Sequence, residues 1–158
     1  MRAFFSILIF CFFLTSVGAQ DFVELKRVQD SIYQSNIKKS RIGGVYIPKS
    51  MEDAYHEIDN LSPPEARNKF KNADEIMVAK KLHFGLGNWI KVNWNFEEGS
   101  RLSHIIKGYK IVHPDDMVNF MLRSYHRYLN NKDQEYEERA KEYVNKRSAE
   151  FNKKKYGQ

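Results

Sequence analysis

Apolar residues recur at intervals of three and four along most of the chain, and this spacing constrains the fold more than any other feature of the sequence. Residues at that spacing share one face of an α-helix, which can be buried against a core. In the segment 74–94 this face consists of Leu82, Leu86, Trp89, Ile90 and Asn93. We therefore predict an all-α fold, a small orthogonal helical domain of about five to six helices.

One stretch interrupts the helical pattern. Residues 41–48 (RIGGVYIP) contain the pair Gly43-Gly44, which lets the backbone turn, and a proline that disfavours helix at the residue before it. We expect a linker here, with a short extended segment near Val45–Ile47.

Residues 1–19 have the composition of a secretory signal peptide. Arg2 gives a positive start, an apolar run follows from Ala3 to Leu14, and Val17-Gly18-Ala19 have the small side chains of a cleavage site. The apolar run is shorter than the roughly 20 residues that a membrane-spanning helix needs. We predict cleavage after Ala19, export to the periplasm or the medium, and no transmembrane segment in the mature chain.

Cys11 is the only cysteine, and it lies within the predicted signal peptide. A mature chain without cysteine can form no disulfide, thiolate metal site or cysteine nucleophile. The formal net charge of +6 comes from lysines and arginines that alternate with acids, and the aromatic residues do not interleave with the basic ones as a base-stacking surface requires. We expect a solvated basic surface and no nucleic-acid partner.

Helix start signals divide the mature chain further. Ser50 and Asp53 have the spacing of a capping box, Ser62-Pro63-Pro64 is typical of a capped helix start, and Ser100 precedes another apolar stripe. After the signal peptide, the predicted organisation is an N-terminal helix and linker at 20–46, a helical core domain at 47–131 and a charged C-terminal helix at 132–158.

Gly85 and Gly87 lie inside the predicted central helix, 74–94, where each costs about 1 kcal/mol relative to alanine. They either mark a break or let a neighbouring backbone approach closely, and we favour the second interpretation. They do not form a phosphate-binding loop, because a third glycine and a preceding strand are missing.

Histidine suits both proton transfer and metal binding. The candidates are His56, His83, His104, His113 and His126. None has the local spacing of a metal site, so we expect no metal and no cofactor. His113 with Asp115 and Asp116 resembles an acid–base or cation-binding cluster in composition, and His126 is a further candidate. The sequence HPDD is also typical of a helix N-terminus, and we favour this interpretation.

Several other polar and aromatic residues are candidates for binding. Tyr125, His126 and Arg127 leave the predicted core face of their helix, so they are either presented to a partner or pocket, or packed against the C-terminal helix. Trp94, in a predicted loop with Phe96, can anchor a ligand or cover a small core.

Arg101 follows the predicted cap at Ser100. It can hold an anion at the N-terminus of its helix, or bridge to Glu97 or Glu98.

The strings HFGLGNWIKVNW, GSRL, HPDDM and SYHRYLN together resemble a bacterial domain family of unknown function, over about Ile47 to Asn130. Lys91 stands where the family pattern has arginine and Phe96 where it has tryptophan, and lysine cannot fully replace an arginine that makes a two-pronged contact. The resemblance implies no activity. It implies one constellation, which is His83, Trp89, Trp94, Arg101, His113, Asp115, Asp116, Tyr125, His126 and Arg127.

Three hypotheses about function follow. The leading one is a non-enzymatic module that binds a protein or an anionic cell-envelope ligand. Its binding residues would be His83, Trp89, Trp94, Arg101, Tyr125, His126 and Arg127. The alternative is a periplasmic hydrolase with His113 or His126 as general base, and Asp115 or Asp116 to orient it or hold a cation. In the third, the constellation is a structural polar network that fixes how the helices pack.

Overall fold

The computed structural model describes residues 21–157, which form a mainly helical domain with a small β-hairpin and so confirm the predicted fold class. The predicted signal peptide and its cleavage site lie outside the described residues. A helix at 21–36 comes first. The following elements are, in chain order, β1 (Arg41–Ile42), β2 (Val45–Tyr46), α2 (Met51–Leu61), α3 (Pro64–Lys71), α4 (Glu75–Leu82), the π-helix η1 (His83–Gly87), α5 (Asn88–Asn93), α6 (Arg101–Gly108), α7 (Pro114–Leu129) and α8 (Tyr136–Tyr156).

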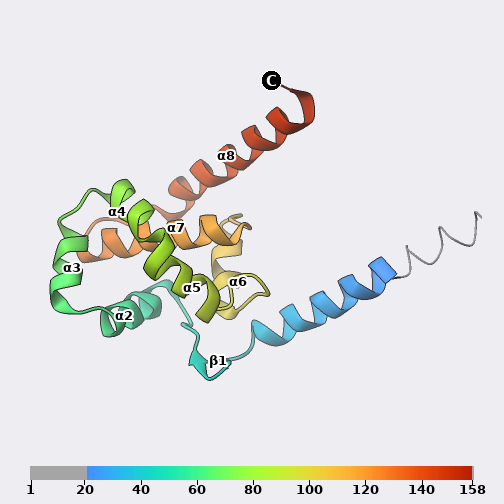
Figure 1. Cartoon of the computed structure of the whole chain (residues 1–158), viewed down its shortest axis with the longest axis horizontal. Helices are drawn as coiled ribbons and strands as arrows, with labels where there is room; N and C mark the ends of the chain where they lie inside the picture. The colour runs from blue at the N-terminus through green and yellow to red at the C-terminus, as the bar shows by residue number, and fades with distance from the viewer. Residues whose placement is uncertain (1–20, 158) are drawn as a thin grey trace, which may run out of the picture.

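Helix α7 lies at the centre of the domain, where it contacts α2, α3, α4, η1, α5 and α8 (Figure 1). It begins with a proline and two acids, as predicted. Its predicted core face is fully buried at Met117, Phe120 and Met121. Ser124 on the same face is also buried, and its hydroxyl donates a 2.7 Å hydrogen bond to the Phe120 carbonyl. Helix α7 can therefore be buried at the centre of the domain, because this face is apolar and the Ser124 hydroxyl is hydrogen-bonded within the helix.

The segment predicted as one helix, 74–94, consists of α4, η1 and α5. A turn of π-helix holds one residue more than a turn of α-helix. Gly87 lies in the π-helix against α7, where an added Cβ atom would be 2.7 Å from Val118 Cγ1 and 3.3 Å from the Leu82 carbonyl oxygen. Gly85 faces open space. The favoured interpretation, the close approach of a neighbouring backbone, is therefore wrong. Gly87 makes room for the Val118 side chain, and the π-helix breaks the α-helical pattern as the other interpretation proposed.

Two helix starts differ from the predicted caps. The Ser50 hydroxyl accepts a 3.1 Å hydrogen bond from the Asp53 amide, as predicted. The Asp53 carboxylate accepts in return from the Lys49 amide at 2.8 Å, one residue earlier than a capping box requires. Ser62 does not cap α3, because it ends α2 and Pro63 occupies the N-cap position.

The predicted extended stretch is the antiparallel hairpin of β1 and β2. Arg41 pairs with Tyr46 and Ile42 with Val45. The two glycines between the strands turn the chain with φ angles of 56° and 81°, a left-handed conformation that glycine adopts without a steric penalty. The chain then enters the core at Ile47, which is fully buried.

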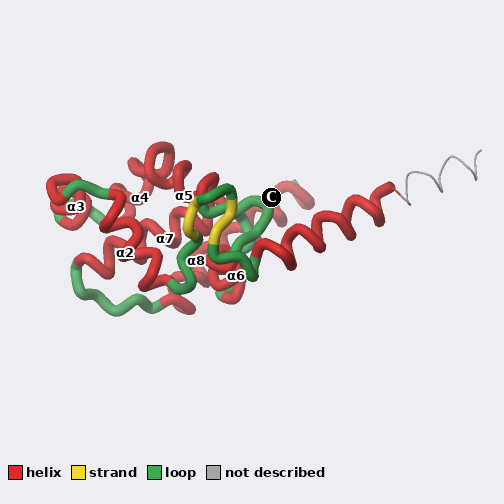
Figure 2. Tube along the Cα trace, turned by 90° about the horizontal axis from the view of Figure 1, so that it is seen from below, coloured by secondary structure: helices red, strands yellow, loops and turns green. Residues whose placement is uncertain are grey.

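Two helices extend beyond the body of the domain, one at each end of the described chain (Figure 1, Figure 2). The helix at 21–36 is largely exposed, and Asn36 at its end is its buried residue. Helix α8 is buried near its start, at Arg139, Ala140 and Tyr143, and its later turns leave the domain. No helix within residues 21–157 is long and apolar enough to cross a membrane.

Candidate functional site

Arg101 joins the hairpin to α6, which starts at the Ser100 cap as predicted. Its Nε atom donates a 2.7 Å hydrogen bond to the Ile47 carbonyl, which also accepts from Nη2. The guanidinium carbon lies 5.1 Å from the centre of the Tyr46 ring. Arg101 thus packs two elements together, and within the described residues it forms no ion pair with Glu97 or Glu98.

Asp116 is buried and paired with α8. Arg147 donates to both of its carboxylate oxygens, at 2.5 and 3.0 Å, and also to Glu150 at 2.9 Å. The hydrogen bond to Asp116 is the chief reason that the pKa of Arg147 is raised. This ion pair occupies the carboxylate, so Asp116 does not orient a histidine.

Arg123 and Arg127 of α7 both bind Glu75, in the first turn of α4. The distance from Arg123 Nε to the Glu75 carboxylate is 2.9 Å, and the Arg127 guanidinium lies 3.5 Å from the same carboxylate. Arg127 also pairs with Glu135 and donates a 2.6 Å hydrogen bond to the Asp133 carbonyl. Burial alone would raise the pKa of Glu75, but the hydrogen bond and charge of Arg123 hold it below the usual value. Arg127 is therefore held between elements of the fold.

Tyr125 and His126 are both buried. The His126 Nε2 atom lies 2.9 Å from the Ala73 carbonyl, to which it donates, and the ring stands edge-on to Phe70 with centroids 5.7 Å apart. The Tyr125 hydroxyl donates a 2.5 Å hydrogen bond to Asp59, and burial, followed by this bond, raises the pKa of Tyr125. His126 therefore packs against the α3–α4 turn. Elsewhere on this second face of α7, Arg123 pairs with Glu142 of α8 at 2.7 Å and Asn119 accepts a 2.7 Å hydrogen bond from the Tyr143 hydroxyl, so the predicted contact with the C-terminal helix is found for part of the face.

The two candidate catalytic histidines are far apart. His113 is exposed immediately before α7, whereas His126 is buried near the end of the same helix. Their separation of 126 − 113 = 13 residues corresponds to about 20 Å along a helix axis. No group of three or more side chains suited to hold a metal occurs in the described part of the chain.

Trp94 and Phe96 belong to the core, where each is 1% exposed. Trp89 is partly buried and stands edge-on to Trp94, with ring centroids 6.1 Å apart. Of the two predicted roles, covering the core is therefore the one observed, and neither Trp94 nor Phe96 is available to anchor a ligand.

A partly exposed portion of the motif is an ion-pair cluster around Asp115. The Lys91 ammonium lies 3.0 Å and the His83 Nε2 atom 3.7 Å from one oxygen of its carboxylate. The hydrogen bond from Lys91 is the largest of the causes that lower the pKa of Asp115. Beside the cluster, Phe84 is 88% exposed and stands edge-on to the His83 ring. Ion pairs that remain partly open to solvent contribute up to about 1 kcal/mol each.

An apolar cleft of about 520 Å³ lies between α3 and the α4–η1 segment. Ala66 and Phe70 of α3 line one wall, Val78 of α4 and Leu86 of η1 line the other, and Tyr125 of α7 contributes its aromatic ring. Cavities of this size are in the range that holds small molecules. The cleft is therefore the part of the fold best shaped to enclose an apolar group.

The charged residues of this cleft are all cationic. Arg67, Lys69 and Lys81 line it, and no acidic residue does. Arg67 lies 3.6 Å from the Asp59 carboxylate, whereas Lys69 and Lys81 have no ion-pair partner within the described residues. Apolar walls with unpaired cations match a molecule that has an aliphatic body and a negatively charged end.

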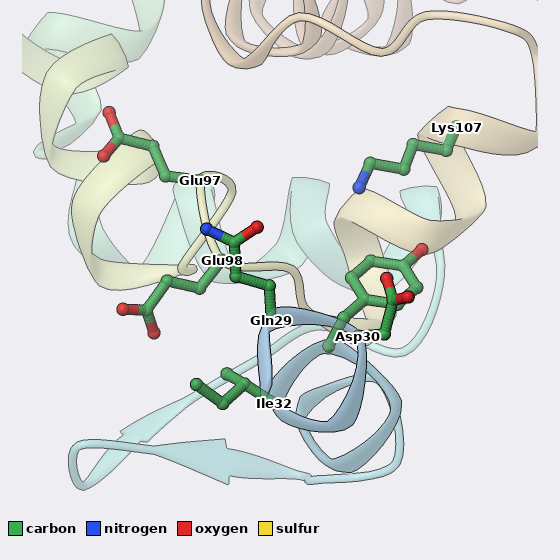
Figure 3. Close-up of a pocket in the computed structure, with 7 residues that line it drawn as sticks. Gln29, Asp30, Ile32, Glu97, Glu98 and Lys107 are labelled. Carbon is green, nitrogen blue, oxygen red and sulfur yellow. The ribbon is translucent and has the colours of Figure 1, made fainter. Parts of the chain in front are cut away.

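A second cleft, of about 700 Å³, lies between the helix at 21–36 and the loop after α5 (Figure 3). Two glutamates of the loop stand on one side and Lys107 of α6 on the other. Tyr33 attaches the helix at 21–36 to α6. Its hydroxyl is 2.8 Å from His104 Nδ1, and its ring centre is 4.3 Å from the Lys107 ammonium. Gly99 leaves room for this ring, since an added Cβ would be 2.1 Å from it. This polar cleft therefore lies where the helix at 21–36 is attached to the domain.

The sequence analysis did not identify the apolar cleft, because α3 (PEARNKFK) consists mostly of polar and charged residues, which are typical of an exposed helix. Phe70 is in fact 4% exposed and belongs to the core. The signal was present in the sequence: Ala66, Phe70 and Ala73 are spaced by four and three residues, which places them on one helical face.

One domain-family model matches residues 47–129, and its description reads "Domain of unknown function (DUF6794)". The match begins where the chain enters the core and ends with α7. No curated protein and no solved structure matches the chain significantly.

Proposed function

This chain belongs to the DUF6794 family of domains of unknown function, and we propose that it is a non-enzymatic binding module for an anionic amphiphile. The ligand would lie in the cleft between α3 and the α4–η1 segment. The observation that carries the proposal is the lining of this cleft, which combines apolar walls with three cations and no acid.

The walls favour an aliphatic body. Burial of each methylene group contributes about 0.8 kcal/mol, so a chain of several carbons gains most of its affinity from the cleft walls. Tyr125 adds a ring rather than a free polar group, because its hydroxyl already donates to Asp59. An aliphatic ligand would therefore meet few uncompensated polar atoms.

The cations favour a negatively charged end on the ligand. Lys69 belongs to α3 and Lys81 to α4, so a head group at the mouth of the cleft would have a cation on either wall. Each such exposed contact contributes up to about 1 kcal/mol. We propose that the ligand is a fatty acid or a related lipid with an anionic head. The export predicted from residues 1–19 would bring the cleft into contact with envelope lipids.

The motif constellation has a structural role in this proposal. Arg101, Asp116 and Arg127 use their charged groups to hold elements of the fold together. His126 is buried and donates to a carbonyl, which argues against its use as a general base in a hydrolase. The binding residues of the proposal, Lys69 and Lys81 among them, therefore lie outside most of the motif.

The first test is calorimetric titration with decanoate, and with decanol and decyltrimethylammonium as ligands of the same chain length. We expect decanoate to bind most tightly. Ala66→Trp fills the cleft and should weaken binding at least about tenfold, since it displaces two or more methylene groups. Asn68→Trp, on the same helix but outside the cleft, is the matched control and should bind like the natural chain.

Charge reversal tests the head-group contact. Lys69→Glu and Lys81→Glu should each weaken decanoate binding by up to about fivefold, in proportion to a contact of about 1 kcal/mol. Lys80→Glu, which is exposed on α4 outside the cleft, should have little effect. Equal affinity for decanoate and decyltrimethylammonium, or equal losses in Ala66→Trp and Asn68→Trp, would contradict the proposal.

A further inference from the structure

Helix α8 continues beyond its last contact with the domain. Within residues 21–157, the pair Arg147–Asp116 provides the last hydrogen bonds that join α8 to another element. The nine residues that follow, 148–156, remain helical and extend for about 13 Å at the usual rise per residue. All of them are exposed, and they lead away from the domain in Figure 1. We refer to residues 148–156 as the distal arm.

The distal arm carries an excess of positive charge. Lys153, Lys154 and Lys155 are consecutive, so they point about 100° apart and surround the helix end. The acid of the arm, Glu150, already accepts a 2.9 Å hydrogen bond from Arg147. None of the three lysines has an ion-pair partner among the described residues. Their charges are therefore available to an anionic surface.

Two aromatic residues stand among these lysines. Phe151 is 62% and Tyr156 63% exposed, and the Lys155 ammonium lies 5.8 and 5.2 Å from their ring centres. Lysines at the last turn of a helix complement its dipole, but that effect requires no aromatic neighbours. Exposed rings beside lysines are typical of helices at a membrane interface, where the rings enter the head-group region and the ammonium groups remain at the phosphates.

We propose that the distal arm binds the surface of an anionic phospholipid bilayer. The three lysines contact lipid phosphates, and Phe151 is inserted at the boundary between head groups and acyl chains. Nucleic-acid phosphates would attract the same lysines, but the arm contains no arginine for base edges and a duplex offers no apolar layer for Phe151. This inference does not depend on the proposed ligand of the α3–α4 cleft.

The test is co-sedimentation of the chain without its predicted signal peptide, residues 20–158, with vesicles of phosphatidylglycerol and phosphatidylcholine, or of phosphatidylcholine alone. We expect binding to the anionic vesicles that weakens as salt is added. Replacing all three arm lysines by glutamine should lower the partition coefficient by about 100-fold, since each contributes about fivefold. Phe151→Ser should lower it by about tenfold through loss of the apolar contact.

The matched control changes the same charge elsewhere, with Lys38, Lys80 and Lys132 all replaced by glutamine. These lysines are exposed and lie outside α8, so binding should fall far less than in the arm variant. No binding to anionic vesicles, an equal loss in the control, or lysine-dependent binding to duplex DNA but not to vesicles would overturn the proposal. Ala66→Trp should leave vesicle binding unchanged, which separates this result from the test of the cleft.

Discussion

The ion pair between Asp116 and Arg147 holds the root of α8, and its two members are not equivalent. The Asp116 side chain is 7% exposed and that of Arg147 is 38% exposed. Without the Asp116 charge, Arg147 can turn toward water and keep its hydrogen bond to Glu150. Without the Arg147 guanidinium, both oxygens of a buried carboxylate lose their donor. We therefore predict that Arg147→Met destabilises the domain more than Asp116→Asn.

The magnitudes follow from the two hydrogen bonds, at 2.5 and 3.0 Å, that the pair contains. A hydrogen bond to a charged group contributes about 1.5–3 kcal/mol, and breaking a buried pair from one side costs about 3–5 kcal/mol. Because Arg147 is partly solvated, we expect about 2–3 kcal/mol for Arg147→Met. Asp116→Asn keeps an acceptor for Arg147 and should cost about 1 kcal/mol. The double variant should cost about as much as Asp116→Asn alone, which corresponds to a coupling energy of about 2 kcal/mol.

Urea unfolding at neutral pH, followed by the fluorescence of the buried Trp94, measures these free energies. Lys146→Met, on the exposed side of α8, is the control and should change the free energy of unfolding by less than about 0.5 kcal/mol. Equal costs for the two single substitutions, or a double variant whose cost is the sum of the single costs, would refute the reasoning.

Three further predictions concern other parts of the fold. Gly87→Ala should lower the free energy of unfolding by about 1–3 kcal/mol, because its Cβ would overlap α7, whereas Gly85→Ala meets no atom and should be neutral or stabilising in the same urea assay. Arg101→Ala should cost about 1–3 kcal/mol by leaving the buried Ile47 carbonyl without its donor, and Arg101→Lys should recover part of this loss in thermal melts. The pKa of Glu75 in the folded state lies below its usual 4.5, so its ion pairs stabilise the domain above pH 4.5, and this stabilisation is lost as the pH falls through the folded-state pKa. When unfolding is measured from neutral pH to below 4.5, the free energy of unfolding of Glu75→Gln should therefore fall less steeply than that of the natural chain. Parallel curves for the two proteins would contradict this.

Apolar spacing was sufficient to predict the helices, but not where a helix changes type. In the segment 74–94, Leu82 and Leu86 fit a continuous α-helix. Within the π-helical turn, Gly87 packs against Val118, which lies 118 − 87 = 31 positions further along the chain. Patterns within one helix carry no information about such a contact, because it is decided by the packing of two elements.

The polar residues show the same limit more clearly. The residue types alone indicated that Arg101 and Tyr125 need hydrogen-bond partners. Their partners, the Ile47 carbonyl and Asp59, lie 54 and 66 residues away. Local rules reach only about four residues along a helix, so they predicted solvent-facing roles for side chains that long-range contacts bury. The cleft was missed for a different reason: Phe70 lies between Lys69 and Lys71, and the other apolar residues of its helical face are alanines.

The π-helical turn at His83–Gly87 also accommodates one extra residue between α4 and α5. One residue fewer would turn it into α-helix and leave α5 in nearly the same phase relative to α4, because a π turn and an α turn each complete one revolution. Loss of a second residue would rotate α5 by about 100° relative to α4 and carry the buried side chains of Ile90 and Trp94 out of the core. Insertions and deletions among members of the family are therefore expected in connections such as 130–135, which can change length without changing the phase of any helix.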